Sequence, residues 1–403
     1  MAKKSEKYIT ERINIQKLIP GGQALGQLAD GKKIMLWGVL PGEIATKIRV
    51  TREKSNYLEG VVEEFEQASE HRIDAKDDCY LATSPWQILD YDYELAQKKS
   101  LLVEILRQQK IDTDCDVSAV ETDGREFFYR NKMEYALYFA FEDQKIHLAF
   151  HERGSFRKRI VDQSSLEKPE IFAKATQIVD ELNANHDEAR KYQMILMRAD
   201  QTGQVSGGLV ANYQPRPVFE NLTDEILGYN YSYSPNGFFQ INLPVYEMAL
   251  REIKKHITTN KVLDLYAGVG TIGLSVARDH NLTLVESNGA AYQEMQRNCE
   301  GTHRFLKKSK IQPVLAKSEE ALEYIANDQT VIVDPPRAGL DSKVVERILE
   351  AEPAVVIYLS CNPITQARDV KNLSEKYQVR QITPFNFFPR TPHLENLIIL
   401  GRR

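Results

Sequence analysis

The sequence predicts a multidomain α/β protein whose C-terminal part is a doubly wound, Rossmann-like sheet. Two observations carry this prediction. From about residue 230 onward, buried strand-like runs alternate with helical segments, which is typical of a largely parallel sheet covered by helices. The first 65 or so residues instead contain short strand-like runs separated by turns, which indicates a small β-barrel. A mostly β central domain is expected between them, with boundaries at residues 1–66, 67–225 and 226–403.

Composition places the chain among ordinary globular proteins. It has 403 residues, 42% hydrophobic and 27% charged, and a net charge of −5. Nucleic-acid binding would therefore depend on local basic patches. No segment approaches the ~20 apolar residues of a membrane span, and no signal-peptide core follows the basic N-terminus. We expect a cytoplasmic protein without a membrane partner. None of the four cysteines forms a C-x-x-C pair, so neither a metal site nor a disulfide framework is predicted.

Strands are expected in the N-terminal part at residues 33–39, 43–50 and 57–63. Turn signals separate them at Pro20-Gly21-Gly22, Asp30-Gly31 and Pro41-Gly42. Small barrels of this kind often bind oligonucleotides, although a purely structural module is the alternative. A helix with one apolar face is expected at about residues 91–110, where it could pack on the C-terminal domain.

A basic run in the central domain is a candidate for RNA contact. It consists of Arg153 and the sequence Arg157-Lys158-Arg159. A solvated charged loop is an equally good explanation of this run taken alone.

A glycine-rich loop follows the expected strand at residues 262–266. Gly268, Gly270 and Gly273 allow a sharp turn and close approach of the backbone to a ligand. Glu286, at the end of the next strand, can accept hydrogen bonds from both hydroxyls of a ribose. The loop predicts a nucleotide cofactor but does not by itself distinguish NAD from S-adenosylmethionine.

Three residues with chemical potential lie at the ends of expected strands. Asp334 follows residues 331–333, Cys361 follows residues 355–359, and Glu395 precedes residues 396–400. Ligands of open α/β sheets bind beyond the carboxyl ends of the strands. Each residue has an alternative explanation: Asp334 as a helix cap, Cys361 as a small buried hydrophobe, and Glu395 as a solvated charge. Their convergence on one edge of the sheet favours a reaction site.

This set of residues matches the needs of methyl transfer to a pyrimidine ring carbon. C5 of uracil becomes nucleophilic once a thiolate adds to C6, and a base must later remove the C5 proton so that the thiolate can leave. We therefore hypothesise that Cys361 is the nucleophile and Glu395 the base. Because no hydride-transfer arrangement is evident, S-adenosylmethionine is the favoured cofactor.

The chain resembles the RNA 5-methyluridine methyltransferases, which methylate C5 of uridine in tRNA or 23S rRNA. The N-terminal residues resemble a TRAM domain, a small RNA-binding barrel, through Ile19-Pro20-Gly21-Gly22-Gln23-Ala24-Leu25-Gly26, Gly31-Lys32 and Leu40-Pro41-Gly42-Glu43. The other matching motifs, in the family's order, are Tyr129-Arg130-Asn131-Lys132, Phe238-Phe239-Gln240-Ile241-Asn242, residues 264–270, Asp334-Pro335-Pro336-Arg337-Ala338-Gly339, Ser360-Cys361-Asn362-Pro363 and His393-Leu394-Glu395.

The resemblance implies a class I S-adenosylmethionine-dependent methyltransferase domain at residues 226–403. Cys361 matches the family's nucleophile and Glu395 its proton acceptor. The implied cofactor-binding residues are Gln240, Tyr266, Gly268, Gly270, Thr271, Glu286 and Asp334. The expected RNA contacts are Arg130, Lys132, Arg157, Arg159, Phe238 and Phe239, the last two stacking on the target base or else packing in the core.

The sequence departs from the family at several positions. Many members hold an iron–sulfur cluster on four cysteines, but only Cys79 is present near the first group, so no cluster is expected. Trp86 is expected to fill the corresponding volume. Thr271 replaces the usual Asn, and Lys317 stands near an expected acid. Since Lys cannot accept a hydrogen bond from an adenine amino group, Ser318 or the backbone has to do so, or cofactor affinity is reduced.

Several alternatives stay open at this point. The substrate can be tRNA or 23S rRNA, and the target atom can instead be cytosine C5 or a base amino group. A non-catalytic RNA-binding protein on the same scaffold is a third possibility. The resemblance suggests a monomer.

Overall fold

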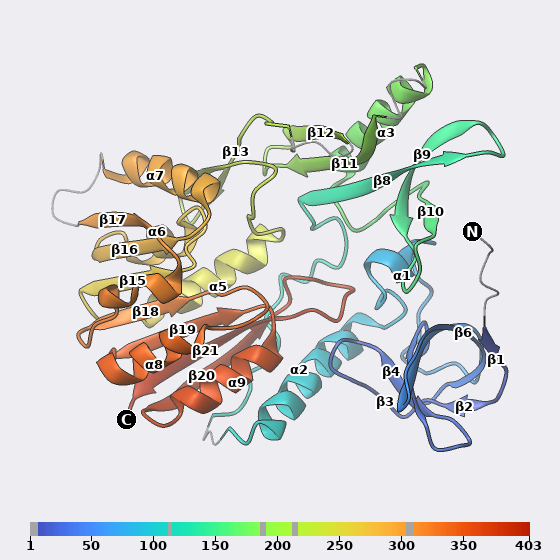
Figure 1. Cartoon of the computed structure of the whole chain (residues 1–403), viewed down its shortest axis with the longest axis horizontal. Helices are drawn as coiled ribbons and strands as arrows, with labels where there is room; N and C mark the ends of the chain where they lie inside the picture. The colour runs from blue at the N-terminus through green and yellow to red at the C-terminus, as the bar shows by residue number, and fades with distance from the viewer. Residues whose placement is uncertain (1–6, 112–114, 186–190, 212–216, 304–309) are drawn as a thin grey trace.

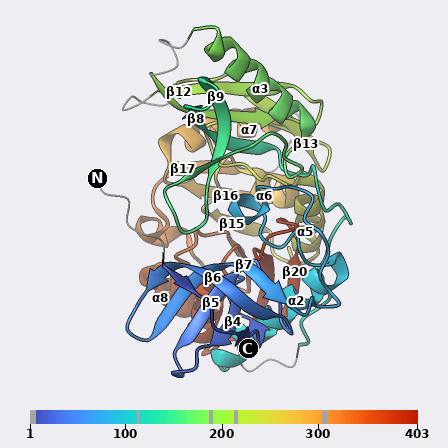
Figure 2. The same ribbon diagram turned by 90° about the vertical axis from the view of Figure 1, so that its right-hand side faces the viewer.

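The computed structural model describes residues 7–111, 115–185, 191–211, 217–303 and 310–403. These residues form an N-terminal β-barrel, a central β domain and a C-terminal α/β domain (Figure 1). Figure 2 shows the barrel and the central sheet at opposite ends of the molecule. No helix within the described ranges is long and apolar enough to cross a membrane.

The barrel is a sheet in the order β1-β6-β7-β5-β4-β3, with β2 also paired to β6. The expected strands at 33–39, 43–50 and 57–63 correspond to β5, β6 and β7. Alternate side chains such as Ile34, Leu36 and Ile48 are fully buried inside it, as the two-residue period of a strand requires. The strands are β1 (Tyr8–Ile9), β2 (Ile13–Asn14), β3 (Lys17–Leu18), β4 (Ala24–Gln27), β5 (Lys33–Trp37), β6 (Ile44–Glu53) and β7 (Tyr57–Glu66).

Two helices follow the barrel, α1 (Tyr80–Thr83) and α2 (Tyr91–Gln108). Helix α2 begins where the side chain of Asp90 accepts a hydrogen bond from the backbone N–H of Tyr93 at 2.8 Å, a typical N-cap. Further along, Leu101 packs in the barrel core, whereas Leu102 and Ile105 pack against the C-terminal sheet. The helix therefore joins the barrel to the C-terminal domain.

The central domain is an antiparallel sheet in the order β10-β9-β8-β11-β12, with α3 packed against it. Figure 1 shows this domain in green. Its elements are β8 (Lys132–Ala140), β9 (Lys145–His151), β10 (Lys158–Ile160), α3 (Pro169–Asn183), β11 (Tyr192–Ala199) and β12 (Val205–Ala211).

The C-terminal domain is built on a sheet in the order β17-β16-β15-β18-β19-β21-β20. Its first five strands are parallel to one another. Strand β21 is antiparallel to both of its neighbours, β19 and β20. The strands are β15 (Lys261–Leu265), β16 (Asn281–Glu286), β17 (Ile311–Leu315), β18 (Gln329–Val333), β19 (Val355–Ser360), β20 (Tyr377–Phe385) and β21 (Glu395–Arg402). The helices are α5 (Leu243–Lys255), α6 (Thr271–Ala277), α7 (Gly289–His303), α8 (Ser342–Ala351) and α9 (Pro363–Leu373), with short helical turns η1 (Ser318–Glu320) and η2 (Leu322–Tyr324).

Both faces of this sheet are buried. Helices α5, α6 and α7 cover one face, and α2, α8 and α9 cover the other. Central strands such as β18 are consequently buried throughout, as expected for parallel strands covered on both sides. The predicted α/β fold with a mostly β middle is confirmed.

One expected boundary lies inside a strand pair. Strand β13 (Leu222–Ile226) crosses residue 225 and pairs with β14 (Tyr229–Tyr233). Leu222 and Ile226 are buried in the same core as α5 and α6. The hairpin therefore packs with the C-terminal domain, and that domain begins before residue 226.

Candidate active site

The glycine loop lies between β15 and α6. Gly268 and Gly270 have φ angles of +57° and +86°, and Tyr266 also has a positive φ of +64°. Such angles are easy for glycine and uncommon for other residues. A Cβ added to Gly268 would meet nothing within 4 Å, so the loop backbone borders open space at this position. That space is suitable for a bound cofactor.

Two carboxylates hold the loop in shape. Glu286, at the end of β16, accepts hydrogen bonds from the N–H groups of Gly268 at 2.9 Å and Asn288 at 2.6 Å. Asp264, inside β15, accepts from Gly273 N–H at 2.8 Å, and burial raises its pKa to about 8. Glu286 thus lies where the ribose of a nucleotide cofactor is usually bound. Asp264 was missed because an acid inside an apolar strand gives no ligand signal.

The sheet register brings the thiol and the glutamate together. Strands β19 and β21 are antiparallel, and Ser360 pairs with Asn396. The next residues outward from this pair are Cys361 and Glu395, which therefore face each other at the end of the sheet. Asp334 follows Val333, which pairs with Tyr358 of β19. The three residues that the sequence analysis placed at one edge are thus neighbours.

The charge state of this cluster is dominated by burial. Burial, Glu395 and Asp334 raise the pKa of the Cys361 thiol to about 11, while Arg337 opposes the shift. Burial and Asp334 raise the pKa of Glu395 well above its usual value, and burial raises the pKa of Asp334 to about 7. Oε2 of Glu395 is buried and has no hydrogen-bond partner within the described chain. A buried acceptor of this kind indicates a binding site for an outside group.

Backbone contacts fix the loops around the thiol. The carbonyl oxygen of Arg337 accepts hydrogen bonds from Asn362 Nδ2 at 2.8 Å and Thr365 Oγ1 at 3.1 Å. Gln366 Nε2 donates to the carbonyl oxygens of Tyr358 and Asn396, both at 2.9 Å. The loops that carry Arg337, Cys361 and Glu395 are therefore tied into one unit.

Residues 238–240 separate into buried and exposed positions. Phe238 is 75% exposed, whereas Phe239 is buried and stacks on Tyr233 with ring centroids 3.8 Å apart. Gln240 is also buried, and its carbonyl oxygen accepts a hydrogen bond from Asn131 Nδ2 at 3.0 Å. Of the two expected base-stacking residues, only Phe238 is accessible, because the ring of Phe239 is part of the core.

The candidate RNA-binding cations lie on the central domain. Arg130 donates through Nε to the carbonyl oxygen of Lys132 at 2.8 Å, and Lys132 Nζ lies 3.4 Å from the carbonyl oxygen of Gly237. Arg157 pairs with Glu152 at 3.0 Å, and Arg159 is exposed. Arg130 and Lys132 therefore lie close to the chain segment that carries Phe238.

The two departures at the cofactor positions differ in burial. Thr271 is buried at the start of α6. Lys317 is exposed and pairs with Glu320 at 3.5 Å. Ser318 is buried, and its side chain forms a hydrogen bond with Tyr266. Lys317 therefore points toward solvent, and Ser318 lies beside an expected cofactor residue.

The surroundings of Cys79 do not suit a four-thiolate cluster, because the other three cysteines lie in other parts of the fold. Asp77 accepts hydrogen bonds from Ser165 N–H at 3.0 Å and from Gln87 Nε2 at 2.9 Å, forming a buried polar network there. Trp86 packs in the barrel core, whereas Cys79 packs in the core of the central domain, and the indole N–H of Trp86 donates to the carbonyl oxygen of Gly22 at 3.0 Å. No group of three or more potential metal ligands is found in the described ranges.

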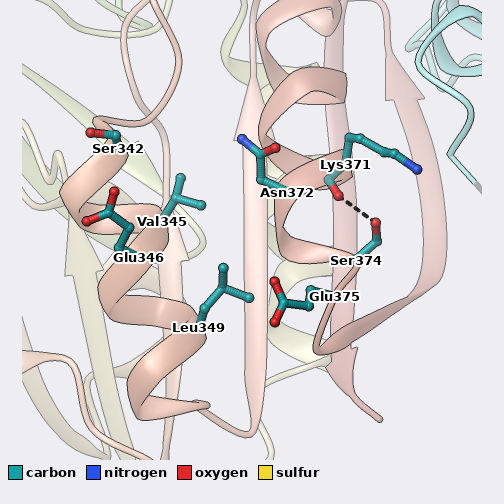
Figure 3. Close-up of a pocket in the computed structure, with 8 residues that line it drawn as sticks. All are labelled: Ser342, Val345, Glu346, Leu349, Lys371, Asn372, Ser374 and Glu375. Atoms are coloured by element: carbon teal, nitrogen blue, oxygen red, sulfur yellow. Dashed lines mark hydrogen bonds between the residues drawn. The ribbon is translucent and has the colours of Figure 1, made fainter.

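A separate groove of about 650 Å³ runs between α8 and α9 (Figure 3). Its lining includes Ser342, Leu349, Lys371 and Glu375. None of the candidate site residues lines it, and it lies on the outer side of the helices that cover the sheet. It is therefore not the reaction site.

Comparisons with known proteins agree with this geometry. Residues 218–403 match a family model described as tRNA (Uracil-5-)-methyltransferase. A Pyrococcus abyssi protein named tRNA (uracil(54)-C(5))-methyltransferase is 29% identical, covering 77% of this chain and 81% of the relative. An uncharacterized RNA methyltransferase of Bacillus cereus is 26% identical, covering 97% of this chain and 96% of the relative.

A solved structure extends the similarity to the whole fold. The crystal structure of the P. abyssi tRNA (uracil-54, C5)-methyltransferase in complex with S-adenosyl-L-homocysteine superposes with a TM-score of 0.74. The two chains are 26% identical, and the match covers 97% of this chain and 100% of the other.

The Rossmann-like sheet, its glycine loop and these similarities define an S-adenosylmethionine-dependent methyltransferase. Residues 218–403 are similar to the tRNA (Uracil-5-)-methyltransferase family, and nearly the whole chain is similar in fold to a solved tRNA uracil-C5 methyltransferase.

Proposed function

We propose that the protein methylates C5 of a uridine in tRNA, with Cys361 as nucleophile and Glu395 as base. The observation that carries the proposal is the antiparallel register of β19 and β21, which sets the thiol opposite the glutamate. The names of the P. abyssi relatives favour tRNA over 23S rRNA. Monomeric state and cytoplasmic location stay predictions.

The side chains divide the reaction between them. The Cys361 sulfur forms a bond to C6 of the uracil, which turns C5 into a carbon nucleophile. When bound, S-adenosylmethionine supplies an electrophilic methyl group to C5. Glu395 then accepts the C5 proton, and the bond between sulfur and C6 breaks to release 5-methyluridine and the thiolate. The buried, unpartnered Oε2 of Glu395 is the atom suited to accept that proton.

The cofactor is proposed to bind between the glycine loop and the ends of β15, β16 and β18. Gly268 and Gly270 allow close backbone approach, and Glu286 is in place to bind the ribose hydroxyls. Tyr266, Gln240, Thr271 and Asp334 are proposed to contribute to the same site. Ser318, rather than the exposed Lys317, is the side chain available for the adenine.

The target uridine has to leave its base stack to reach a cysteine that is only partly exposed. Phe238, which is 75% exposed beside Gln240, is proposed to stack on the extruded base. Base stacking on an aromatic side chain contributes roughly 1–3 kcal/mol.

Tritium release from [5-³H]uridine-labelled RNA tests the proposal directly. We expect release from bulk tRNA and not from rRNA when S-adenosylmethionine is present. Cys361→Ala should abolish release but leave cofactor binding intact. Persistent release by this variant would contradict the role of Cys361. Release from rRNA alone would move the substrate to 23S rRNA, and a modified cytosine or amino group in the product would identify another target atom.

A further inference from the structure

Two arginines of the central domain, Arg130 and Arg153, are held in the same way. Arg130 and Arg153 each use only Nε to bind a main-chain carbonyl oxygen, that of Lys132 at 2.8 Å and that of Leu81 at 2.7 Å. Within the described part of the chain, neither guanidinium forms an ion pair with a carboxylate at 4.0 Å or less. The terminal nitrogens of both side chains are therefore directed to no anion of the protein itself.

Arg153 is fixed where three parts of the molecule meet. Its guanidinium lies 4.2 Å from the ring centroid of Trp37 in barrel strand β5, and its Nε partner belongs to α1. The next residue, Gly154, packs against β6: a Cβ there would lie 2.6 Å from Cβ of Thr51. A guanidinium held on an aromatic face in this way loses little freedom when it binds a ligand.

Both arginines lie near the loop that leads to Glu395. Arg130 and Arg153 are close enough to His393 to contribute to its lowered pKa of about 4, together with burial, Arg337 and Lys98. His393 is only two residues from the proposed base. An accumulation of positive charge at this point, in a protein of net charge −5, would be offset by an anionic ligand.

Two other arginines, Arg72 and Arg390, are instead paired with carboxylates of the protein. Arg72 binds both carboxylate oxygens of Glu43, at 2.5 and 2.7 Å. Arg390 pairs with Glu94 and Glu126. These guanidiniums are neutralised by the protein, whereas Arg130 and Arg153 are held through a single N–H each.

We propose that Arg130 and Arg153 form a phosphate clamp that grips the RNA backbone beside the extruded uridine. Guanidinium groups suit this task because their planar fork can bind two phosphate oxygens at once. The clamp rests on the proposed function, and it explains how the central domain aligns RNA with Cys361 and Glu395. Phosphate contacts position a nucleic acid without reading its sequence.

The test is RNA binding across a salt series, using bulk tRNA as the probe. Arg153→Ala and Arg130→Ala should each weaken binding about tenfold and reduce the slope of log affinity against log salt by about 0.7–1. Arg251→Ala is the matched control, since Arg251 is an exposed arginine on α5 paired with Glu247. It should leave the slope unchanged.

Folding is monitored by thermal melting and by S-adenosylmethionine binding, which both clamp variants should retain. Arg153→Gln removes the charge but keeps an N–H donor toward Leu81, and it replaces Arg153→Ala if that variant unfolds. If the variants at Arg130 and at Arg153 both show the wild-type slope of log affinity against log salt, the clamp is excluded. If wild type releases tritium while the slopes stay unchanged, only the clamp fails. If the slopes fall but wild type methylates no RNA, the clamp stands and the proposed function fails.

Discussion

At the scale of single residues, the site is built from acidic groups whose pKa values are raised. Burial and the two neighbouring carboxyls raise the pKa of the Cys361 thiol to about 11, and burial and Asp334 raise the pKa of Glu395 well above its usual value. Both proposed roles need the deprotonated form. The resting site therefore contains less negative charge than three separate acids would carry, which lowers the cost of burying them together.

Activity should consequently rise with pH. The thiol and the glutamate both have raised pKa values, so each deprotonation favours the reaction as pH increases through the neutral range toward 9. A profile of kcat/KM against pH, measured with tRNA, checks this. A profile that falls across this range would contradict the assigned roles.

Replacing Glu395 distinguishes its proposed role from that of Cys361. In Glu395→Gln the C5 proton is no longer removed, so methylated RNA should stay covalently attached to Cys361 and migrate with the protein on a denaturing gel. The loss of the carboxylate should also lower the pKa of the Cys361 thiol, since Glu395 raises it. Adduct formation should then begin at lower pH than turnover by the wild type. Normal turnover by this variant would exclude Glu395 as the base.

At the scale of secondary-structure elements, α2 positions the segment that precedes β21. Lys98 is fully buried and donates to Glu94 Oε1 at 2.8 Å, Asn386 Oδ1 at 2.6 Å and the carbonyl oxygen of Phe388 at 3.1 Å. Glu94 in turn accepts from the backbone N–H of Arg390 at 3.0 Å. The network fixes the chain that leads to His393 and Glu395.

Removing this lysine should be costly. Lys98→Ala leaves the Glu94 charge buried beside a cavity, and we expect the free energy of unfolding to fall by about 3–5 kcal/mol. Lys99→Ala, one position along the same helix and less buried, should change it by less than about 0.5 kcal/mol. Denaturant titration of both variants measures the difference. Equal stabilities would show that the network contributes little.

The sequence predicted elements well where the hydrophobic pattern was strong. The strands β15, β16, β18, β19 and β21 lie where apolar runs were found, and the strand-end positions of Asp334, Cys361 and Glu395 followed from them. Strand β20 was missed because charged residues such as Arg380 interrupt its pattern. The Lys98 network also could not be predicted from the sequence, because Lys98 and its partner Asn386 are 288 residues apart. The contact between Trp86 and Gly22 could not be predicted for the same reason, since the two residues are distant in sequence.

At the scale of the whole molecule, the barrel touches the segment that leads to the proposed base. The turn between β3 and β4 packs on Pro392: a Cβ at Gly22 would lie 2.2 Å from Cβ of Pro392. Trp86 joins the same contact, since its backbone N–H donates to the carbonyl oxygen of Arg390 at 3.0 Å. A displacement of the barrel would therefore reach the segment that precedes Glu395 through direct packing.

Two adjacent glycines allow this coupling to be tested. Gly21 and Gly22 have φ angles of +98° and +91°, so alanine strains the backbone at either position. Only at Gly22 does the new methyl group collide with Pro392, because a Cβ at Gly21 meets nothing within 4 Å. We expect Gly22→Ala to lower kcat at least tenfold relative to Gly21→Ala, measured by tritium release at saturating tRNA. Equal kcat values would show that the contact does not reach the base.

The position of α2 has a consequence for folding during synthesis. Leu102, Ile105 and Leu106 pack in one core with Ile398 and Leu400 of β21. The hydrogen bond of Lys98 can form only after Asn386, 288 residues later, has been synthesised. At about 5–20 residues per second, the ribosome needs roughly 15–60 s to supply those partners. The barrel can close early, but the apolar side of this helix stays uncovered throughout that interval. The nascent chain therefore presents a binding site for chaperones well before its reaction centre exists.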